Sequence, residues 1–197
     1  CEHWEAVPDL IVMSKGLGAG YAPLGAVAAR TDIVGTVLDS GGFLHGFTSA
    51  GNPLSCAAGL AVIEEMEEHD IIGNAAAMGT LLKRRLTALR KRFPFIGDVR
   101  GKGLLLAFEL VADPDSLTPL PAEWNAFTEL VEIAYERGLI LYARRTRGGT
   151  EGDHFLVCPP LIITARQVEE LLALLTESLE VFASRHGLPV LHHAAAR

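Results

Sequence analysis

A lysine that follows a short apolar segment is the first candidate for chemistry in this sequence. The segment Asp9–Met13 is apolar enough to form a short buried strand, and Lys15 follows it. Three nearby glycines, Gly16, Gly18 and Gly20, leave no bulky side chain beside the amine. Desolvation at such a position would lower the pKa of the Lys15 amine toward its nucleophilic, neutral form. Alternatively, Lys15 extends into solvent and the glycines form a turn.

The same glycines could form a dinucleotide-binding loop, because a predicted strand precedes them. Their spacing is G-x-G-x-G rather than G-x-G-x-x-G, and the following Leu24–Ala29 is predicted to be extended rather than helical. No acidic residue closes a second strand. We therefore disfavour a Rossmann-type site.

A second segment with useful chemistry, His45–Pro53, directly precedes a predicted helix. Its adjacent hydroxyls, Thr48 and Ser49, are suited to bind a phosphate, because backbone N–H groups and the helix dipole favour anions at a helix N-terminus. Alternatively, one of the two is an ordinary N-cap. A candidate Schiff-base lysine together with a candidate phosphate-binding turn is what a pyridoxal-phosphate enzyme requires.

Hydrophobic periodicity predicts the elements that must position these residues. Helices are expected at Pro53–Glu68 and at about Ile72–Arg92, where Pro94 ends the second. A helix capped by Thr164 and Gln167 is expected near the C-terminus. The second half is predicted to be an α+β layer with strands at 96–100, 104–111, 139–143 and 154–158, helices at 122–137 and 165–185, and a loop at 144–152.

The change in sequence pattern near residue 95 predicts a domain boundary. We expect residues 1–95 to belong to one domain and residues 96–186 to form a smaller second domain. Residues 187–197, which include His192 and His193, show no periodicity and are expected to be frayed.

Composition excludes several classes of protein. A chain of 197 residues with 49% hydrophobic residues, 21% charged residues and a net charge of −7 is an ordinary globular protein, neither disordered nor collagen-like. The basic cluster Lys83–Arg92 shares a helical pattern with leucines, so we interpret it as a solvated face and expect no nucleic-acid partner.

The cysteines and the apolar segments bear on compartment. Cys1, Cys56 and Cys158 have neither metal-ligand nor disulfide-framework spacing, so we expect no metal site and a reducing, cytoplasmic location. No apolar segment is long enough for a membrane span and the first residues are not a signal peptide, so we expect a soluble protein with no membrane partner.

Four motifs occur in the order found in one enzyme family. They are P-D-L-I-V-M-S-K-G-L-G-A-G-Y-A-P-L-G-A from Pro8, H-G-F-T-S-A-G-N-P from His45, V-R-G-K-G-L-L-L-A-F-E-L-V from Val99, and G-D-H-F-L-V-C-P-P-L-I-I-T from Gly152. Together they resemble the class III (omega) pyridoxal-phosphate-dependent aminotransferases over residues 8 to about 185. The resemblance implies an α/β protein, a fold-type I PLP-dependent transferase. The chain would supply the back part of the large cofactor-binding domain and the α+β C-terminal small domain, about half of a family member.

The resemblance also implies roles for single residues. Lys15 matches the lysine that holds pyridoxal 5'-phosphate as an aldimine and acts as nucleophile and base. Phe47 and Thr48 match the pair that binds the cofactor phosphate from the neighbouring subunit, which implies a homodimer with shared active sites. Cys158–Leu161 matches the strand end on the substrate side of the cleft. Asn52 replaces a frequent histidine, and we expect it to serve at the start of the helix.

Family members place a carboxylate-binding arginine before the C-P-P motif. This chain offers Arg144, Arg145 and Arg147 there, but has Leu156 in the strand itself. We predict Arg147, and after it Arg145, as the substrate-binding residue on a mobile, glycine-rich loop. The alternative is that these arginines are solvated. Leu156 favours an amine or omega-amino-acid donor with a keto acid such as pyruvate as acceptor.

Other groups that the family needs have no match in this sequence. The aspartate that pairs with the pyridinium nitrogen, the glycine-rich phosphate cup and the ring-stacking aromatic residue would all precede Cys1. The chain therefore resembles an incomplete fragment, which alone is expected to be nearly inactive. Two alternatives stay open: a mutase or decarboxylase on the same scaffold, and a truncated, inactive structural or interaction unit.

Overall fold

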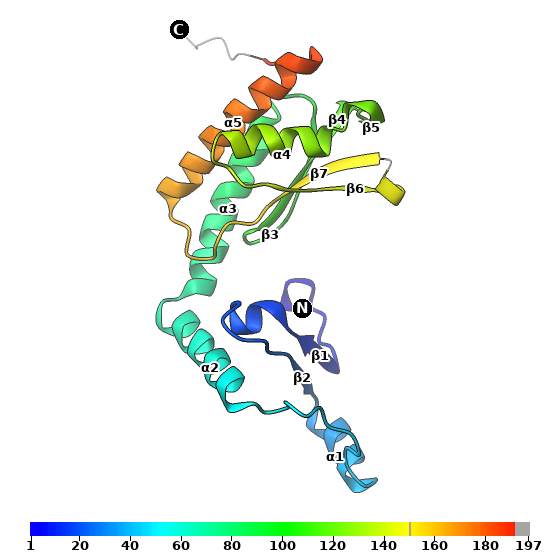
Figure 1. Ribbon diagram of the computed structural model, residues 1–197, viewed down its shortest axis with the longest axis vertical. Helices are drawn as coiled ribbons and strands as arrows, with labels where there is room; N and C mark the ends of the chain where they lie inside the picture. The colour runs from blue at the N-terminus through cyan, green and yellow to red at the C-terminus, as the bar shows by residue number, and fades with distance from the viewer. Residues whose placement is uncertain (150, 192–197) are drawn as a thin grey trace. The chain divides into compact units, whose positions relative to one another are not determined.

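The structure is a computed structural model that describes residues 1–149 and 151–191. The chain divides into two compact units, Cys1–Asp70 and a second that begins at Ile71 (Figure 1). This division precedes the boundary that we expected near residue 95, because helix α3 (Ile71–Leu89) packs against the sheet and the last helix of the second unit. His192 and His193 lie outside the described residues.

The first unit is built around a two-stranded antiparallel ladder. β1 (Leu10–Met13) pairs with β2 (Ala26–Ala29), so that Leu10 lies opposite Ala29. The 3-10 helix η2 (Lys15–Gly18) follows β1. The unit also contains η1 (Glu2–Trp4), α1 (Thr31–Asp39) and α2 (Pro53–Glu68).

One sequence prediction for this unit is wrong, and one helix was missed. Strand β1 is exposed rather than buried, with Val12 79% exposed, because no described element covers either face of the two-stranded ladder. Helix α1 was not predicted, since Gly35 and several β-branched residues weaken its helical pattern. The predicted bounds of α2 are confirmed.

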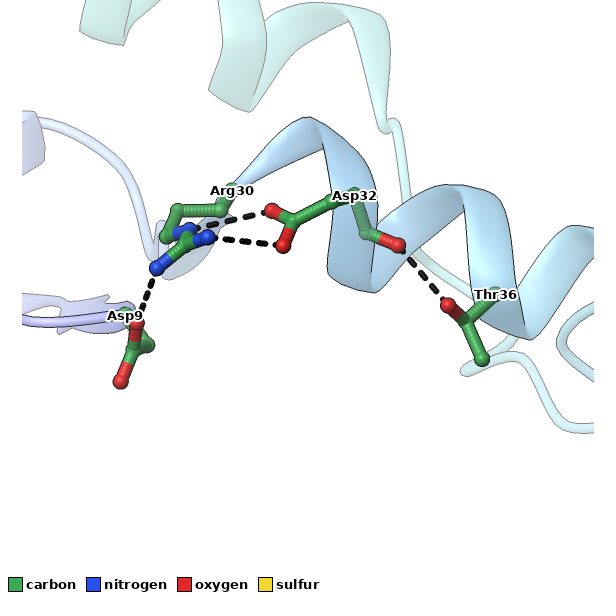
Figure 2. Close-up of polar contacts among 4 residues, drawn as sticks. All are labelled: Asp9, Arg30, Asp32 and Thr36. Carbon is green, nitrogen blue, oxygen red and sulfur yellow. Dashed lines mark hydrogen bonds and ion pairs between the residues drawn. The ribbon is translucent and has the colours of Figure 1, made fainter.

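A charged contact joins the start of β1 to the end of β2. The Arg30 guanidinium donates to the Asp9 carboxylate at 2.9 Å and makes a two-pronged contact with Asp32 at 2.8 and 3.0 Å (Figure 2). The backbone N–H of Arg30 also donates to the Asp9 carbonyl. Arg30 therefore fixes the register of the strand that leads to Lys15.

The second unit is an antiparallel sheet covered by helices. β3 (Ile96–Lys102), β4 (Leu105–Asp113), β7 (Glu151–Val157) and β6 (Tyr142–Thr146) lie in that order, and β5 (Thr118–Pro119) pairs with β4. Helix α3 packs on β3 and β4, α4 (Ala126–Glu136) packs on β6 and β7, and α5 (Ala165–His186) packs on both helices (Figure 1). The sequence-predicted α+β layer is thus confirmed.

Aromatic and leucine side chains form the core of this unit. Phe108 and Phe155, opposite each other on β4 and β7, stack at 5.0 Å between ring centroids and are fully buried. Leu82 and Leu86 of α3 and the apolar stripe of α5 pack around them. The predicted capping box at the start of α5 is confirmed, since Thr164 accepts from the Gln167 N–H and Gln167 accepts from the Thr164 N–H.

Three predictions for the second unit need correction. The strand expected at 139–143 is β6, which begins only at Tyr142 and continues through both arginines that we had placed in a loop. The helix expected at 122–137 is interrupted at Asn125, whose backbone is left-handed. The tail begins ordered rather than frayed, because Leu188 packs on the core and the Leu191 N–H donates to the Arg92 carbonyl.

The described residues contain neither a membrane-spanning helix nor a cluster of metal-ligand side chains. None of the helices in this part of the chain is both long and apolar enough to cross a membrane. Over the same residues, no group of three or more histidine, cysteine, aspartate or glutamate side chains is placed to hold a metal ion.

Candidate active site

Lys15 lies at the point where β1 ends and η2 begins. Its backbone φ is +54°, in the left-handed region that a lysine rarely adopts. Backbone strain of this kind concentrates at functional positions. The side chain is exposed, so the described chain does not provide the dry surroundings that we expected. Among the described residues the Lys15 ammonium has no hydrogen bond or ion pair, which leaves it available to a ligand.

Close packing fixes the segment that carries Lys15. Helix η2 packs against α2 through Leu24, which lies between Gly18 and Gly59. A Cβ at Gly59 would overlap the Leu24 side chain, whereas a Cβ at Gly16 would meet nothing. The strand β2 follows this turn, so the G-x-G-x-G segment does not open a helix as a dinucleotide loop would.

The turn before α2 carries Thr48 and Ser49, the two hydroxyls that the sequence predicts to bind a phosphate. Asn52, rather than Thr48 or Ser49, caps α2, because its side chain accepts from the Ser55 N–H at 3.2 Å. Its predicted role at the start of the helix is therefore confirmed, and the alternative that a hydroxyl caps the helix is wrong. Thr48 is exposed, and within the described chain its hydroxyl has no partner. Phe47 is 80% exposed, and its ring meets the His45 ring edge-on at 5.3 Å.

These groups fit pyridoxal phosphate chemically. An unpaired primary amine on a strained backbone suits an aldehyde, and an unpaired hydroxyl in a turn at a helix N-terminus suits a phosphate. No hydrogen bond or ring contact among the described residues joins Lys15 to Phe47 or Thr48. Lys15 therefore need not bind the same molecule as Phe47 and Thr48 of the same chain.

The predicted substrate-side segment leaves the sheet at the end of β7. Cys158–Leu161 follows Val157, and it continues to Thr164 at the start of α5. Partial burial raises the pKa of the Cys158 thiol, against a weak opposing contact with the Leu106 carbonyl. The thiol is thus held in its protonated form, which suits packing rather than nucleophilic chemistry.

Arg145 forms a buried ion pair with Asp153 of the same chain. Its side chain is only 7% exposed, its Nε donates to Asp153 at 2.9 Å, and its guanidinium lies 4.7 Å from the centre of the Phe127 ring. Removing one partner of a buried ion pair leaves the other charge unpaired, at a cost of about 3–5 kcal/mol. This arrangement argues against the substrate-binding role that we predicted for Arg145.

Arg144 lies on the opposite face of the same strand, beside Leu156. The register pairs Tyr142 with Leu156 and Arg144 with His154, and alternate residues of a strand share a face. The Arg144 side chain is exposed and its guanidinium stacks 4.6 Å from the centre of the Tyr142 ring. The sequence analysis noted Arg144 but favoured Arg147, which is nearest the glycines of the predicted loop.

Arg147 lies in the turn between β6 and β7. It begins the short segment Arg147–Gly149, in which Gly148 and Gly149 have left-handed φ angles of +69° and +86°. The side chain of Arg147 is outside the described part of the structure. The predicted loop at 144–152 is therefore replaced by a hairpin with a turn that starts after Thr146.

Comparisons with known proteins agree on one family. The family model for class-III aminotransferases matches residues 1–179. YodT, an uncharacterized aminotransferase of Bacillus subtilis, is 39% identical over 90% of this chain and 40% of its own length. A leucine/methionine racemase of Thermococcus litoralis is 36% identical over 86% of this chain and 35% of its own length.

A solved structure agrees with this match. An amine transaminase from an uncultivated Pseudomonas species, in a PLP-bound form, superposes with a TM-score of 0.81 at 32% identity. The match covers 91% of this chain and 40% of that one. The chain thus spans about 40% of the length of YodT and of this transaminase.

Proposed function

This chain belongs to the class-III aminotransferases, and we propose from that premise that the whole protein moves an amino group from an amine or omega-amino acid to a keto acid such as pyruvate. The fold is that of the fold-type I PLP-dependent transferases, and pyridoxal phosphate is their cofactor. The observation that carries the proposal is Lys15, an unpaired amine on left-handed backbone at the end of β1.

In this proposal Lys15 has two successive tasks. When bound, pyridoxal phosphate supplies an electron-withdrawing ring that weakens the Cα–H bond of the amino donor. The Lys15 Nζ would hold the cofactor covalently, and as a free amine it would accept the proton from the donor Cα. The same Nζ would hold and return that proton, so one amine would serve as both anchor and base.

Thr48 and Phe47 are proposed to serve the cofactor of the neighbouring subunit. The support is the turn before α2, where the Thr48 hydroxyl is exposed and has no hydrogen-bond partner among the described residues. Each site would then need two chains, so the whole protein would be an obligate homodimer. Mixing Lys15→Ala chains with Thr48→Ala chains tests this arrangement. Restored activity supports the shared site, and an active monomer contradicts it.

Arg144 and Arg147 are the proposed carboxylate-binding candidates. Arg144 has geometric support, since it shares a sheet face with Leu156 and has no acidic partner among the described residues. A guanidinium beside an apolar strand residue can bind the carboxylate of a keto acid and leave an apolar donor in contact with Leu156 and Tyr142. We also propose a cytoplasmic location, since Cys56 and Cys158 are free thiols.

The deciding experiment labels the lysine directly. Borohydride treatment of the cofactor-loaded whole protein is expected to fix the cofactor on Lys15, detected by peptide mass spectrometry. Lys15→Ala is expected to remove the label and to lower turnover by about a thousandfold or more. Lys91→Ala, a change at another exposed lysine, is the matched control. A Lys15→Ala enzyme with normal turnover would rule out the proposal.

A second reaction is favoured by one relative. The similarity to a racemase suggests that the same lysine could return the proton to the opposite face of the donor Cα instead of transferring the amino group. Assays with and without added keto acid separate the two reactions, because racemisation needs no acceptor. The 197 residues alone are expected to show neither activity, since the groups that would hold the pyridinium ring have no match in them.

A further inference from the structure

One amide side chain of α3 reaches a segment almost ninety positions further along the chain. The Asn74 Nδ2 donates to the Leu161 carbonyl at 2.6 Å and to the Ile163 carbonyl at 3.2 Å. An amide nitrogen has two N–H groups, so a single side chain satisfies both acceptors. Asn74 lies in the first turn of α3, on a helix whose buried leucines anchor it in the core.

The segment that Asn74 holds is Cys158–Thr164, which joins β7 to α5. It has no regular secondary structure, and of its carbonyls that of Thr164, at the end of the segment, accepts from a helix N–H, that of Val168. A turn joins the Ile163 N–H to the Pro160 carbonyl at 3.0 Å, and Ile163 is buried. Among the described residues, the Asn74 amide is the only hydrogen-bond donor to the Leu161 and Ile163 carbonyls.

The consequence of this contact is that two apolar side chains are presented outward. Leu161 is 44% exposed and Ile162 is 68% exposed. Their neighbours in the chain, Pro160 and Ile163, are joined to each other by a backbone hydrogen bond. An aliphatic side chain at position 74 would leave the exposed Leu161 carbonyl and the partly buried Ile163 carbonyl without this donor, and the loop would relax to bring the Ile163 carbonyl to water.

We propose that Asn74 is a positioning residue for substrate binding. It fixes the loop Cys158–Thr164 so that Leu161 and Ile162 keep one position at the substrate side of the site. This inference rests on the proposed function and on the family resemblance, which implies that Cys158–Leu161 lies on the substrate side of the site. Asn74 does not touch substrate; it acts through the two carbonyls that it holds.

The test uses the whole, cofactor-loaded protein with β-alanine as donor and pyruvate as acceptor. Asn74→Asp keeps the shape of the side chain but removes both donors, and Asn74→Ala removes the group altogether. Thr87→Ala is the matched control, since it deletes one side-chain hydrogen bond, to the Lys83 carbonyl, on the same helix. Steady-state kinetics and amide hydrogen exchange are measured for all variants.

Both Asn74 variants are expected to raise KM by about five- to tenfold, with kcat within about twofold of the parent. Exchange at the Ile163 N–H is expected to rise by about tenfold, while the amides of α3 stay protected. The control is expected to change neither quantity. An unchanged KM in a parent enzyme that transaminates overturns the inference and leaves the proposed function standing.

Failure of the proposed function would look different. A parent protein that does not transaminate refutes that function regardless of the variants, and exchange at Ile163 then decides whether Asn74 holds the loop. Unchanged exchange in both variants overturns the inference in either case. If Asn74→Asp does not fold, Asn74→Ala gives the same two measurements without a buried negative charge.

Discussion

The two units of the chain differ in what they bury. In Cys1–Asp70 the only described residues that are fully buried are Gly18 and Gly59, whereas the unit that begins at Ile71 has a continuous core of leucine, isoleucine, valine and phenylalanine. Large exposed apolar residues crowd the first unit, among them Val12, Leu44 and Phe47. An exposed apolar surface of this extent is a mark of a surface that other protein covers.

This difference bears on how the proposed site residues are divided between the two units. The residues proposed to hold the cofactor lie on the unit without a core, and those proposed to recognise substrate lie on the unit with one. A site whose anchor depends on further protein surface fits a chain that spans about 40% of its relatives' length. The second unit needs no such help to hold Arg144 and the loop beyond β7.

Two phenylalanines test this contrast most strongly. Phe155→Ala is expected to lower the free energy of unfolding by about 3–5 kcal/mol, because it removes a fully buried ring that stacks on Phe108. Phe47→Ala should change stability by less than about 0.5 kcal/mol, because the ring is exposed, and should instead weaken cofactor binding. Urea denaturation and cofactor titration measure the two effects. Equal losses of stability would mean that the units do not differ as described.

Two helical glycines give a smaller contrast. A Cβ at Gly79 of α3 would overlap the Gly103 carbonyl, so Gly79→Ala is expected to destabilise the protein by about 2–3 kcal/mol. Gly35 of α1 has open space around it, so Gly35→Ala should be neutral or stabilise by up to about 1 kcal/mol. Thermal and urea denaturation of both variants check the difference. A neutral Gly79→Ala would show that α3 does not pack closely on the β3–β4 hairpin.

Sequence patterns predicted the second unit where local signals were strong. The Thr164–Gln167 capping box and the leucine stripe of α5 lie within one helix and follow from spacing alone. The bounds of α2 were predicted for the same reason, from the small and apolar residues that recur at helical spacing after Pro53.

The failures around β6 share one physical cause, the pairing of residues distant in the sequence. β6 was placed too early because Leu139 and Leu141 are apolar and buried, yet the strand itself runs through Arg144 and Arg145. A buried arginine fits there only because Asp153 lies on the neighbouring strand. No periodicity reveals such a partner, and the same holds for the contact between Asn74 and the loop after β7.

The candidate site was predicted from motifs rather than from physics. Lys15 and Thr48 were chosen from their motifs, and their roles stay predictions. Among the described residues neither side chain has a hydrogen-bond partner. The dry surroundings expected for Lys15 were not predictable from the chain itself, because burial at β1 needs a covering surface that a two-stranded ladder lacks.

The smallest contrast compares two acidic residues, one in each unit. Glu129 on α4 is partly buried and accepts from His186 at 2.6 Å and from Arg185 at 3.1 Å. Burial alone would raise the pKa of Glu129, but these contacts outweigh it and hold the pKa below its ordinary value. Asp9 in the first unit is 67% exposed and meets only Arg30.

Glu129→Gln is therefore expected to destabilise the protein by about 1–2 kcal/mol at pH 7. A carboxylate whose pKa is lowered on folding stabilises the folded state above its unfolded pKa, near 4.5, and loses that contribution as the pH falls through the folded value. The gap in melting temperature between parent and variant should thus stay constant from pH 7 to about 5 and close below about pH 4. Asp9→Asn should cost less than about 0.5 kcal/mol at pH 7, since exposed ion pairs contribute little. A gap for Glu129→Gln that widens on acidification would mean that this carboxylate is not held ionised by His186 and Arg185.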